Sequence, residues 1–513
     1  MKKNIVIVLS VLAAISCSSG VRQDFQVDGP KISIFSDHIS AIARQEGITF
    51  AQAAQNVKEI GFNGVDVRVL QKPSQLKTLD SLGFIYSCAI ADIDYSRGGQ
   101  AELEKKTVAF MKKYGIKQVL LVPGLIPEEA VDEADKADAR SRIVGFADRM
   151  AAKGYEVILE DYDNPRSLCY NTAKLNTLFG MTDNLGMAFD TGNFLFAGED
   201  AYRASLHFAD KVKHVHLKDR AGAKDMKCVP AGTGCIPVEA VVRKLVSVGY
   251  DGWFTAEQFG SKQMLEDVKT AYANISKMLE PTKIGPKITE YYAPEVPVVD
   301  ASSFVPEAGV PEKAVALFNG KDLSKWQTDN DSGSPAGWTV NRDGSMTVNK
   351  KAGSIRTKDE FGSYHIHLEW KVPVGIQGSS QARGNSGVFL NSLYEVQVLD
   401  SYQNPTYVDG MAASIYKQSI PSANPTNAPG QWNTYDIDFQ APVVDAEGKL
   451  VSRPRVTVVF NGVKVQDDVE IFGTTEYIGF PKEQWAARGP IGLQSHGDPS
   501  QPISFRNIWI LEK

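Results

Sequence analysis

Prolines recur between residues 281 and 311, in the stretches EPTKIGPK, APEVPVV and VPEAGVP, and no helical periodicity accompanies them. Such a segment is typical of an extended and fairly stiff linker. The chain has 513 residues, which is more than a single hydrophobic core usually serves. We therefore expect two domains, at residues 27–280 and 313–513, joined by a proline-rich linker at 281–312.

The part of the chain before the linker alternates short β-rich runs with amphipathic stretches such as AELEKKTVAFMKKYG. The β-rich runs are KISIFS, GVDVRV, FIYSCAI, KQVLLVP, YEVILE, LGMAFD, KHVHLKD and GWFTAE. Eight such units in about 250 residues are typical of a (β/α)8 TIM barrel. A doubly wound sheet is the alternative, but it normally has a glycine-rich phosphate turn after its first strand, and here that turn reads FSDHIS.

The part after the linker has a different sequence pattern, in which short alternating strands are separated by Gly, Asn, Pro and Asp turns. The strand candidates are YHIHLEWKV, SGVFL, YEVQVL, YDIDF, RVTVVF, GLQS and FRNIWIL. This pattern predicts an antiparallel, all-β sandwich or jelly roll. The expected fold class is thus a TIM barrel followed by a jelly-roll domain.

Four potential metal ligands lie at or near the ends of successive predicted strands of the first domain. They are Glu160, Asp190, His216 and Glu257. The C-terminal ends of barrel strands frame one open mouth, so side chains there can converge on one point. Three carboxylates and an imidazole form a hard, oxygen-rich set that suits Mn²⁺, Mg²⁺ or Zn²⁺. His214 shares a face with His216 but lies further from the strand end, so we expect His214 to be a hydrogen-bonded residue inside the barrel.

The motifs around these residues, ILE, FDTGN, VHLKD and TAEQ, resemble those of the sugar phosphate isomerase/epimerase family, which is related to xylose isomerases and endonuclease-IV-like barrels. The resemblance covers about half of the chain. It implies a divalent metal bound by the four residues, with Glu160 and Glu257 also moving protons beside a substrate carbonyl. A cation near a ketone oxygen makes the adjacent C–H acidic, because it stabilises the developing enolate charge.

Other residues near the predicted barrel mouth give weaker signals. His38 follows the first strand, at the end of the barrel where substrate would bind. Lys218 and Asp219 would either contact sugar hydroxyls or form a solvated pair. Asp66 is either an acidic site residue or a polar residue of the barrel interior. We retain His38 and Lys218 as candidate substrate-binding residues.

The second domain carries polar residues on one predicted strand, YEVQVLD. Alternation puts Glu395 and Gln397 on one face, and Asp400 follows at the strand end. If that face is concave, it is a polar sugar cleft with a carboxylate; if it is convex, it is the solvated side of a sheet. Further donors and acceptors that would line the same cleft are Arg383, Asn385, Ser386 and His496.

The motifs ALFNGKDLSKW, RGNSGVFL, LYEVQVLD, GQWNTYDI, GPIGLQSHG and ISFRNIWI resemble the 3-keto-disaccharide hydrolase family, also described as 3-keto-glycoside lyases and 2-hydroxyglucal hydratases with a concanavalin-like jelly roll. The resemblance implies cleavage of 3-keto-glycosides by 1,2-elimination and hydration. Glu395 is then the candidate base, His496 or Asp400 the candidate acid, and Arg383 and Asn385 are binding donors, with Ser386 and Gln397 also facing substrate. A ketone at carbon 3 acidifies the hydrogen at carbon 2, which a carboxylate can remove.

Two other functions are compatible with these patterns. The chain would be a metal-dependent sugar isomerase or epimerase whose second domain is a carbohydrate-binding module, or a surface-anchored glycan-capture protein. The sequence does not assign elimination and hydration to particular domains. It holds no dinucleotide fingerprint, so we expect no nicotinamide cofactor, and a separate oxidoreductase would have to supply the 3-keto group. The net charge of -6 gives no electrostatic reason to expect nucleic acid as a partner.

The N-terminus predicts export. Two lysines precede an apolar run from Ile5 to Ile15, which is too short to span a membrane and is typical of a signal peptide at residues 1–17. The segment Ala14–Cys17 resembles the lipobox of bacterial lipoproteins, which implies an acylated Cys17 and membrane contact through this lipid anchor only. Ordinary secretion is the alternative. Cys228 and Cys235 flank the loop PAGTG and would either form a disulfide or stay free.

Overall fold

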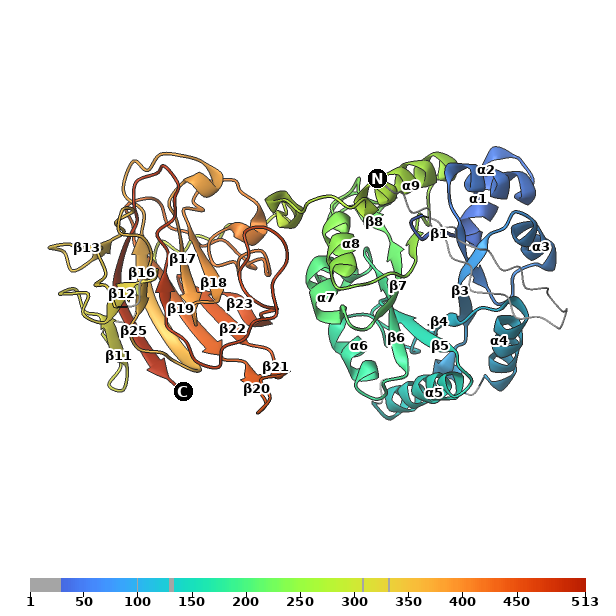
Figure 1. Ribbon diagram of the computed structural model, residues 1–513, viewed down its shortest axis with the longest axis horizontal. Helices are drawn as coiled ribbons and strands as arrows, with labels where there is room; N and C mark the ends of the chain where they lie inside the picture. Colours follow the sequence, from blue (N-terminus) through green and yellow to red (C-terminus); the bar gives the residue numbers. More distant parts are fainter. Residues whose placement is uncertain (1–28, 99, 129–132, 307–308, 331–332) are drawn as a thin grey trace, which may run out of the picture.

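The computed structural model describes residues 29–98, 100–128, 133–306, 309–330 and 333–513. Within them the chain forms a closed α/β barrel followed by a domain of antiparallel sheets. Figure 1 shows the barrel on the right and the antiparallel sheets on the left. The predicted fold class is therefore confirmed for both halves. The predicted signal peptide and Cys17 lie outside the described residues.

The first domain is a barrel of parallel strands in the order β1-β10-β7-β6-β5-β4-β3-β2. The strands are β1 (Ile32–Phe35), β2 (Gly64–Arg68), β3 (Ile85–Asp92), β4 (Gln118–Val122), β5 (Glu156–Glu160), β6 (Leu185–Asp190), β7 (Val212–Leu217) and β10 (Phe254–Ala256). The short strands β8 (Asp219–Arg220) and β9 (Cys228–Val229) pair in the loop after β7. Cys228 and Cys235 are both free thiols.

Helices surround this barrel (Figure 1). They are α1 (Ser36–Glu46), α2 (Phe50–Ile60), α3 (Pro73–Ser81), α4 (Ala101–Tyr114), α5 (Glu133–Ala151), α6 (Thr172–Phe179), α7 (Ala201–Phe208), α8 (Val238–Ser247) and α9 (Met264–Leu279), with the 3-10 turns η1 (Tyr95–Arg97) and η2 (Phe194–Ala197). No helix in the described part of the chain is long and apolar enough to cross a membrane.

Local sequence explains how these elements form. The inner residues of β5 and β6 are apolar and buried, as parallel strands covered by helices require. A capping box starts α2, where the Thr49 hydroxyl accepts from Gln52 N and the Gln52 side chain accepts from Thr49 N. Gly64 begins β2 because a Cβ there would overlap the ring of Trp253.

The second domain packs two antiparallel sheets around a single apolar core. The larger sheet contains β11 (Val315–Phe318), β13 (Thr339–Val340), β14 (Met346–Thr347), β16 (Tyr364–Lys371), β19 (Asn433–Gln440), β22 (Arg455–Phe460), β23 (Val463–Glu470) and β25 (Ser504–Glu512). The smaller sheet has the order β12 (Trp326–Thr328), β15 (Ile355–Thr357), β24 (Gly492–Leu493), β17 (Asn385–Leu390) and β18 (Tyr394–Leu399). A separate hairpin joins β20 (Val443–Val444) and β21 (Leu450–Ser452), and the 3-10 turns are η4 (Ser380–Ala382) and η5 (Val408–Gly410).

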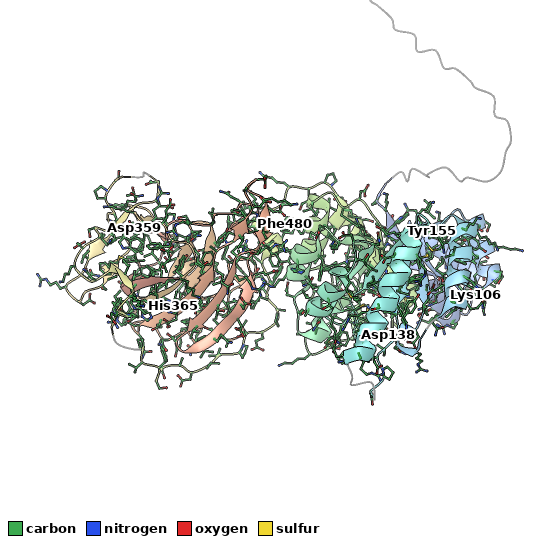
Figure 2. All side chains as sticks on the ribbon, turned by 90° about the horizontal axis from the view of Figure 1, so that it is seen from below. Lys106, Asp138, Tyr155, Asp359, His365 and Phe480 are labelled. Atoms are coloured by element: carbon green, nitrogen blue, oxygen red, sulfur yellow. The ribbon has the colours of Figure 1, made fainter. Side chains whose placement is uncertain are left out.

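The two domains are in contact. Phe472 and Phe480 of the sandwich pack against the core of the barrel, and Figure 2 shows Phe480 at this junction. The proline-rich segment begins with the 3-10 turn η3 (Pro286–Thr289) and then follows the sandwich, where Val299 N donates to Asn424 O at 3.1 Å. A cavity of about 880 Å³ lies between α7, this segment and the sandwich.

Candidate active site

The four residues at the barrel strand ends converge in the structure. Glu160 and Asp190 are the last residues of β5 and β6, His216 is the penultimate residue of β7, and Glu257 directly follows β10. The parallel register pairs Asp190 with His216, and His216 with Thr255. Each of the four offers a ligand atom, and these atoms all lie within 4.8 Å of one another. The strand ends thus bring together the set that the sequence indicates.

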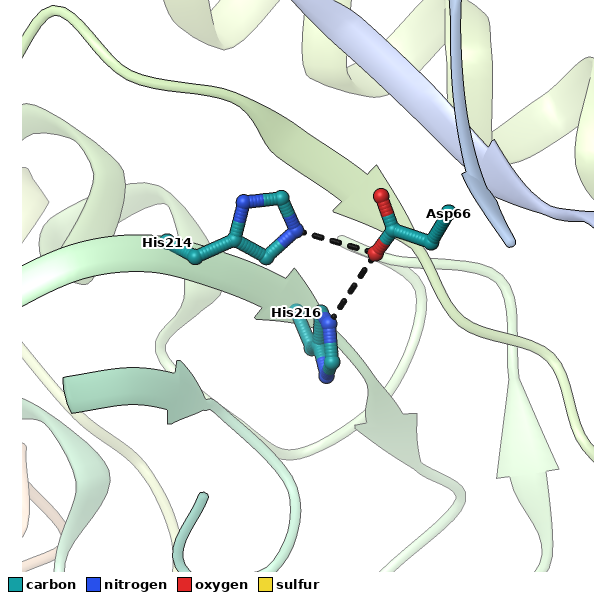
Figure 3. Close-up of side chains that lie close together, drawn as sticks. All are labelled: Asp66, His214 and His216. Carbon is teal, nitrogen blue, oxygen red and sulfur yellow. Dashed lines mark hydrogen bonds and ion pairs between the residues drawn. The ribbon is translucent and has the colours of Figure 1, made fainter. Parts of the chain in front are cut away.

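The surroundings of His216 fit a bound cation. A dashed line in Figure 3 joins its Nε2 to Asp66 Oδ2. These two atoms lie 3.2 Å apart, and its Nδ1 lies 2.5 Å from Glu160 Oε1. A proton on His216 Nδ1 makes this approach favourable; when a divalent cation is bound, Nδ1 would lose that proton and ligate through its lone pair, while the Nε2 proton still faces Asp66. Although burial opposes it, the carboxylates of Glu160 and Asp66 raise the pKa of His216 well above its usual value.

Asp66 and His214 form a polar layer below this point in the barrel interior. His214 Nε2 lies 2.9 Å from both Asp66 Oδ2 and Thr255 Oγ1, and Ser87 donates to the other oxygen of Asp66. His214 is therefore the hydrogen-bonded interior residue that the sequence predicts (Figure 3). Asp66 is both a member of this layer and the partner that fixes the ring of His216. A carboxylate behind a ligating histidine sets its tautomer and its basicity.

Asp190 is held by the tight turn that follows it. Its Oδ1 accepts from Gly192 N at 2.7 Å and Asn193 N at 2.9 Å, which turns Oδ2 toward the cluster. A Cβ on Gly192 would overlap the side chain of Lys218, so glycine is required at this close approach. Burial raises the pKa of Asp190 to about 6.

Lys218 lies inside the cluster rather than in a solvated loop pair. Its Nζ is 2.8 Å from Asp190 Oδ2, 2.5 Å from Glu257 Oε1 and 3.0 Å from Asn193 Oδ1. The second oxygen of Glu257 accepts no hydrogen bond from any described residue. Three carboxylates beside one ammonium leave an excess of two negative charges, which a divalent cation would neutralise.

A cavity of about 430 Å³ opens beside these residues. Phe35 and Phe259 contribute an apolar wall, and Arg68 contributes a cation that lies 2.8 Å from Asp37 Oδ2 and 2.7 Å from Asp92 Oδ2. The cavity is also lined by four residues that are not among the predicted site residues, namely Phe259, Arg68, Asp92 and Asn193. Asn193 had a signal in the DTGN turn, whereas Arg68 and Asp92 become neighbours only when β2 pairs with β3.

His38 packs between the rings of Phe35 and Phe259 and is buried. Its Nε2 accepts a hydrogen bond from Gln258 N at 2.7 Å, and burial lowers its pKa to about 3. The imidazole is therefore neutral and already engaged with the backbone. The carboxylate of Asp219 is also occupied, because it accepts hydrogen bonds from the backbone amides of Gly232, Gly234 and Ile236.

Glu395 of the sandwich is a buried carboxyl with an unusual environment. Tyr394 and Val396 point into the core, so Glu395 projects from the outer face of the smaller sheet, yet it is only 4% exposed. It packs over Gly387, where any Cβ would overlap Oε1. No described residue forms a hydrogen bond with its carboxylate. Burial raises the pKa of Glu395 to about 8.

Gln397 lies on the same outer face, and Gln381 connects it to Asn385. The Gln381 Oε1 atom accepts from Asn385 Nδ2 at 3.1 Å and from Gln397 Nε2 at 3.0 Å. Gln381 lies in the η4 turn before the strand, where no sequence pattern singles it out. A loop covers the outer face of the smaller sheet that carries Glu395 and Gln397. This face is therefore neither of the two alternatives that the sequence left open, an open concave cleft or a solvated sheet surface.

The remaining sandwich candidates have partners of their own. Arg383 Nε lies 2.7 Å from Asp400 Oδ2, so these two form a buried ion pair. Ser386 alternates with Asn385, lies on the side of the sheet that faces the core, and donates to Gln494 O at 2.7 Å. His496 Nδ1 is 3.2 Å from Asp498 Oδ2.

Comparisons with known proteins match both halves of the chain. Residues 54–281 match the family model described as xylose isomerase-like TIM barrel, and residues 313–511 match that of the 3-keto-alpha-glucoside-1,2-lyase-like domain. Each half of the chain thus matches one family model. Both predicted resemblances are therefore confirmed at the level of family.

Similar proteins are found for each domain. Inosose dehydratases from Lacticaseibacillus casei and Clostridium beijerinckii are each 24% identical, over 245 and 253 residues, which is 41% of this chain and 82% of each relative. A candidate glycosyl hydrolase from Parabacteroides distasonis is 52% identical and covers 44% of this chain and 96% of its own, with a TM-score of 0.39. An L-ribulose 3-epimerase is 22% identical, covers 49% of this chain and 95% of its own, and has a TM-score of 0.40.

These matches indicate a carbohydrate-active enzyme, and its xylose isomerase-like barrel contains a candidate metal site. Its lyase-like domain carries a second, separate group of polar residues around Glu395. The catalytic and binding roles of individual residues in both domains stay predictions.

Proposed function

We propose that this protein cleaves 3-keto-glycosides by 1,2-elimination followed by hydration. The observation that carries the proposal is Glu395, a carboxyl buried over Gly387 without a hydrogen-bonding partner among the described residues, in a 3-keto-alpha-glucoside-1,2-lyase-like domain. Proton-transfer catalysis favours a group whose pKa lies near the working pH, and burial raises the pKa of this carboxyl to about 8.

Elimination and hydration each need two proton transfers, and neither needs an oxocarbenium ion. A base removes the hydrogen at carbon 2, a double bond forms between carbons 1 and 2, and the bond from carbon 1 to the glycosidic oxygen breaks. The leaving oxygen takes a proton, and the ketone at carbon 3 holds the charge in between. Water then adds its oxygen to carbon 1 and a proton returns to carbon 2, which completes the net hydrolysis.

Glu395 suits these transfers in both of its protonation states. Its ionised form is a strong base for the proton at carbon 2, and its neutral form can return that proton to the leaving oxygen. The amide nitrogens of Gln397 and Asn385 already donate to Gln381 and Gly410 O. Gln397 Oε1, which has no hydrogen-bond partner among the described residues, is an acceptor for a sugar hydroxyl on the same face. Arg383 holds Asp400 in place beside them by an ion pair, although burial raises the pKa of this carboxyl.

The barrel provides the second proton-transfer site. Glu160, Asp190, His216 and Glu257 would hold a divalent cation (Mn²⁺, Mg²⁺ or Zn²⁺), which supplies electrophilic stabilisation of enolate charge when it is bound. Glu160 and Glu257 border the cavity and are the proton carriers. Lys218 orients Glu257 by an ion pair, and Phe35 and Phe259 keep water from one side of the cavity. The relatives that resemble this domain are named inosose dehydratases, and loss of water is a reaction type related to the elimination proposed here.

Export and partners complete the proposal. The predicted signal peptide and Cys17 support a periplasmic or outer-membrane lipoprotein that touches the membrane through its lipid anchor only. A separate oxidoreductase would supply the ketone at carbon 3. The substrate is a 3-keto-glycoside or the keto sugar derived from it.

The test is incubation of the full-length protein with a 3-keto-glucoside in deuterated water. We expect aglycone release with deuterium at carbon 2 of the sugar. Glu395→Gln should slow release by about 10²- to 10⁴-fold, while Glu160→Gln should change the fate of the keto sugar or glucal-type product. Unchanged cleavage by Glu395→Gln would remove the lyase assignment from the sandwich and favour a carbohydrate-binding role. Absence of any turnover by the wild-type protein on keto sugars would favour glycan capture.

A further inference from the structure

Residues 407–419 of the sandwich, here called the cover segment, lie against the strand that carries Glu395. Tyr416 N donates to Glu395 O at 3.1 Å, and Gln397 N donates to Ser414 O at 3.0 Å. The segment therefore continues the smaller sheet beyond its edge strand β18. Because Tyr416 is the cross-strand neighbour of Glu395, its ring shares the face on which the carboxyl lies.

The barrel holds one end of the cover segment. Arg203, on α7, donates from Nη1 to Gln418 O at 3.1 Å and from Nη2 to Glu470 O at 2.8 Å. Its guanidinium also packs over the ring of Phe472 at 4.9 Å from the centroid. One side chain of the first domain thus joins two backbone carbonyls of the second. Both carbonyls would lose a charged donor if Arg203 were removed.

The proline-rich segment holds the other end. Tyr291 N donates to Asp409 Oδ1 at 3.1 Å, and Val408 N donates to Tyr291 O at 2.7 Å. Lys417 Nζ donates to Pro286 O at 2.9 Å. These bonds cross from the barrel side of the chain to both ends of the cover segment.

We propose that the barrel and the proline-rich segment clamp the cover segment onto β18, so that Arg203 is a positioning residue for Glu395. The inference rests on the proposed role of Glu395. The sandwich site is then complete only while the barrel is docked on it. Contacts of this kind form a contiguous physical connection between the domains.

Release of the clamp has a defined chemical effect. Burial is what raises the pKa of Glu395, and Tyr416 lies next to it within the cover segment. If the segment separates from β18, water reaches the carboxyl and its pKa falls toward 4.5. A merely structural role for Arg203 would leave this pKa unchanged.

The experiment compares Arg203→Met with Arg455→Met in the full-length protein. Arg455 lines the same cavity, carries the same charge and binds Asp468 and Glu470 without touching the cover segment. We expect hydrogen exchange at the amides of Gln397 and Tyr416 to become at least about tenfold faster in Arg203→Met. Arg455→Met should exchange like the wild type, and Arg203→Lys, which restores one donor, should be intermediate. Equal exchange in Arg203→Met and the wild type would overturn the clamp.

A second readout separates the clamp from the proposed function. Infrared titration of the carboxyl band that disappears in Glu395→Gln reports the protonation of Glu395 without any turnover. We expect its pKa to fall in Arg203→Met and to stay unchanged in Arg455→Met, with the pH profile of 3-keto-glucoside cleavage shifting in the same direction. If exchange becomes faster but the titration of Glu395 is unaltered, Arg203 clamps the cover segment without positioning the carboxyl, and that part of the proposal fails. Absence of cleavage by the wild-type protein would refute the proposed function. The exchange and titration experiments would still test the clamp, because neither needs turnover.

Discussion

The Nδ1 atom of His216 lies 2.5 Å from Oε1 of Glu160. The other nitrogen of the ring faces Asp66, so the imidazole lies between two carboxylates, which raise its pKa well above the usual value although burial opposes this. Glu160 and His216 can together bind a cation, and the two further carboxylates within 4.8 Å complete a ligand set for it. The barrel mouth is thus organised around positive charge.

Removing one carboxylate should weaken metal binding. Glu160→Gln keeps the shape of the side chain but replaces a charged ligand by a neutral one, so we expect Mn²⁺ affinity to fall by about 100-fold or more. Isothermal titration of the metal-stripped protein measures this. Glu156→Gln, at the opposite end of the same strand, is the matched control. Equal affinity of the wild type and Glu160→Gln would contradict a metal site at these strand ends.

Asp66 should tune the metal without touching it. Asp66→Asn leaves a hydrogen-bonding group beside His216 Nε2 but removes its charge, and changes of this kind typically cost about 10- to 100-fold in affinity. The same titration measures the effect, and circular dichroism checks that the barrel is folded. An affinity that is unchanged in the folded variant would mean that Asp66 serves only the interior layer.

Glu395 should make the sandwich less stable as the pH rises. Its pKa is about 8 in the folded protein and 4.5 as the ordinary value, so the folded state keeps a proton that the unfolded state loses. The stability that depends on this proton is fully present below pH 4.5 and is lost as the pH rises through about 8. The difference amounts to about 5 kcal/mol at most. Denaturation of wild type and Glu395→Gln from pH 5 to 8.5 should show the slope in the wild type only.

His367 and Asp436 should stabilise the larger sheet in a bounded pH range. His367 Nδ1 lies 2.7 Å from Asp436 Oδ1, and the neighbouring carboxylates raise the pKa of His367 to about 9 although burial opposes this. Although burial opposes it, hydrogen bonds with His365 and His367 lower the pKa of Asp436 to about 2. The His367 contribution is present below pH 6.5 and lost as the pH rises through about 9, and the Asp436 contribution is present above 3.8 and lost as the pH falls through about 2.

A substitution tests this range directly. His367→Gln should lower the free energy of unfolding by about 1–3 kcal/mol at pH 6 and by much less at pH 9.5. Chemical denaturation followed by tryptophan fluorescence measures it, and His365→Gln, at a more exposed site on the same strand, is the milder comparison. A loss of stability that does not change between these pH values would contradict the ion pair.

The sequence predicts the fold and the metal quartet for the same physical reason. Parallel strands end at one rim, so residues at successive strand ends must lie near one another, and Glu160, Asp190, His216 and Glu257 follow that rule. The place of Lys218 among them depends on the turn at Gly192, which no periodicity encodes. The opposite orientations of Asn385 and Ser386 follow from strand alternation, but the position of Gln381 does not.

Contacts between the domains were beyond sequence reasoning altogether. In the sequence, nothing distinguishes Arg203 from any other charged residue of an amphipathic helix. Its partners Gln418 and Glu470 lie more than 200 residues away along the chain. The cover segment has no strand-like alternation, because its bonds to β18 are made by a bent loop with a positive φ at Ala413 and Lys417. Only the assembled surface shows that the outer face of β18 is covered.

The proline-rich segment between the domains forms hydrogen bonds with the sandwich instead of passing through solvent. A chain built this way should tumble as one particle, so relaxation measurements would give a single rotational correlation time for both domains. Lengthening the segment before Tyr291 with a few glycines would uncouple the two rotations only if it also broke the bonds to Val408 and Asp409.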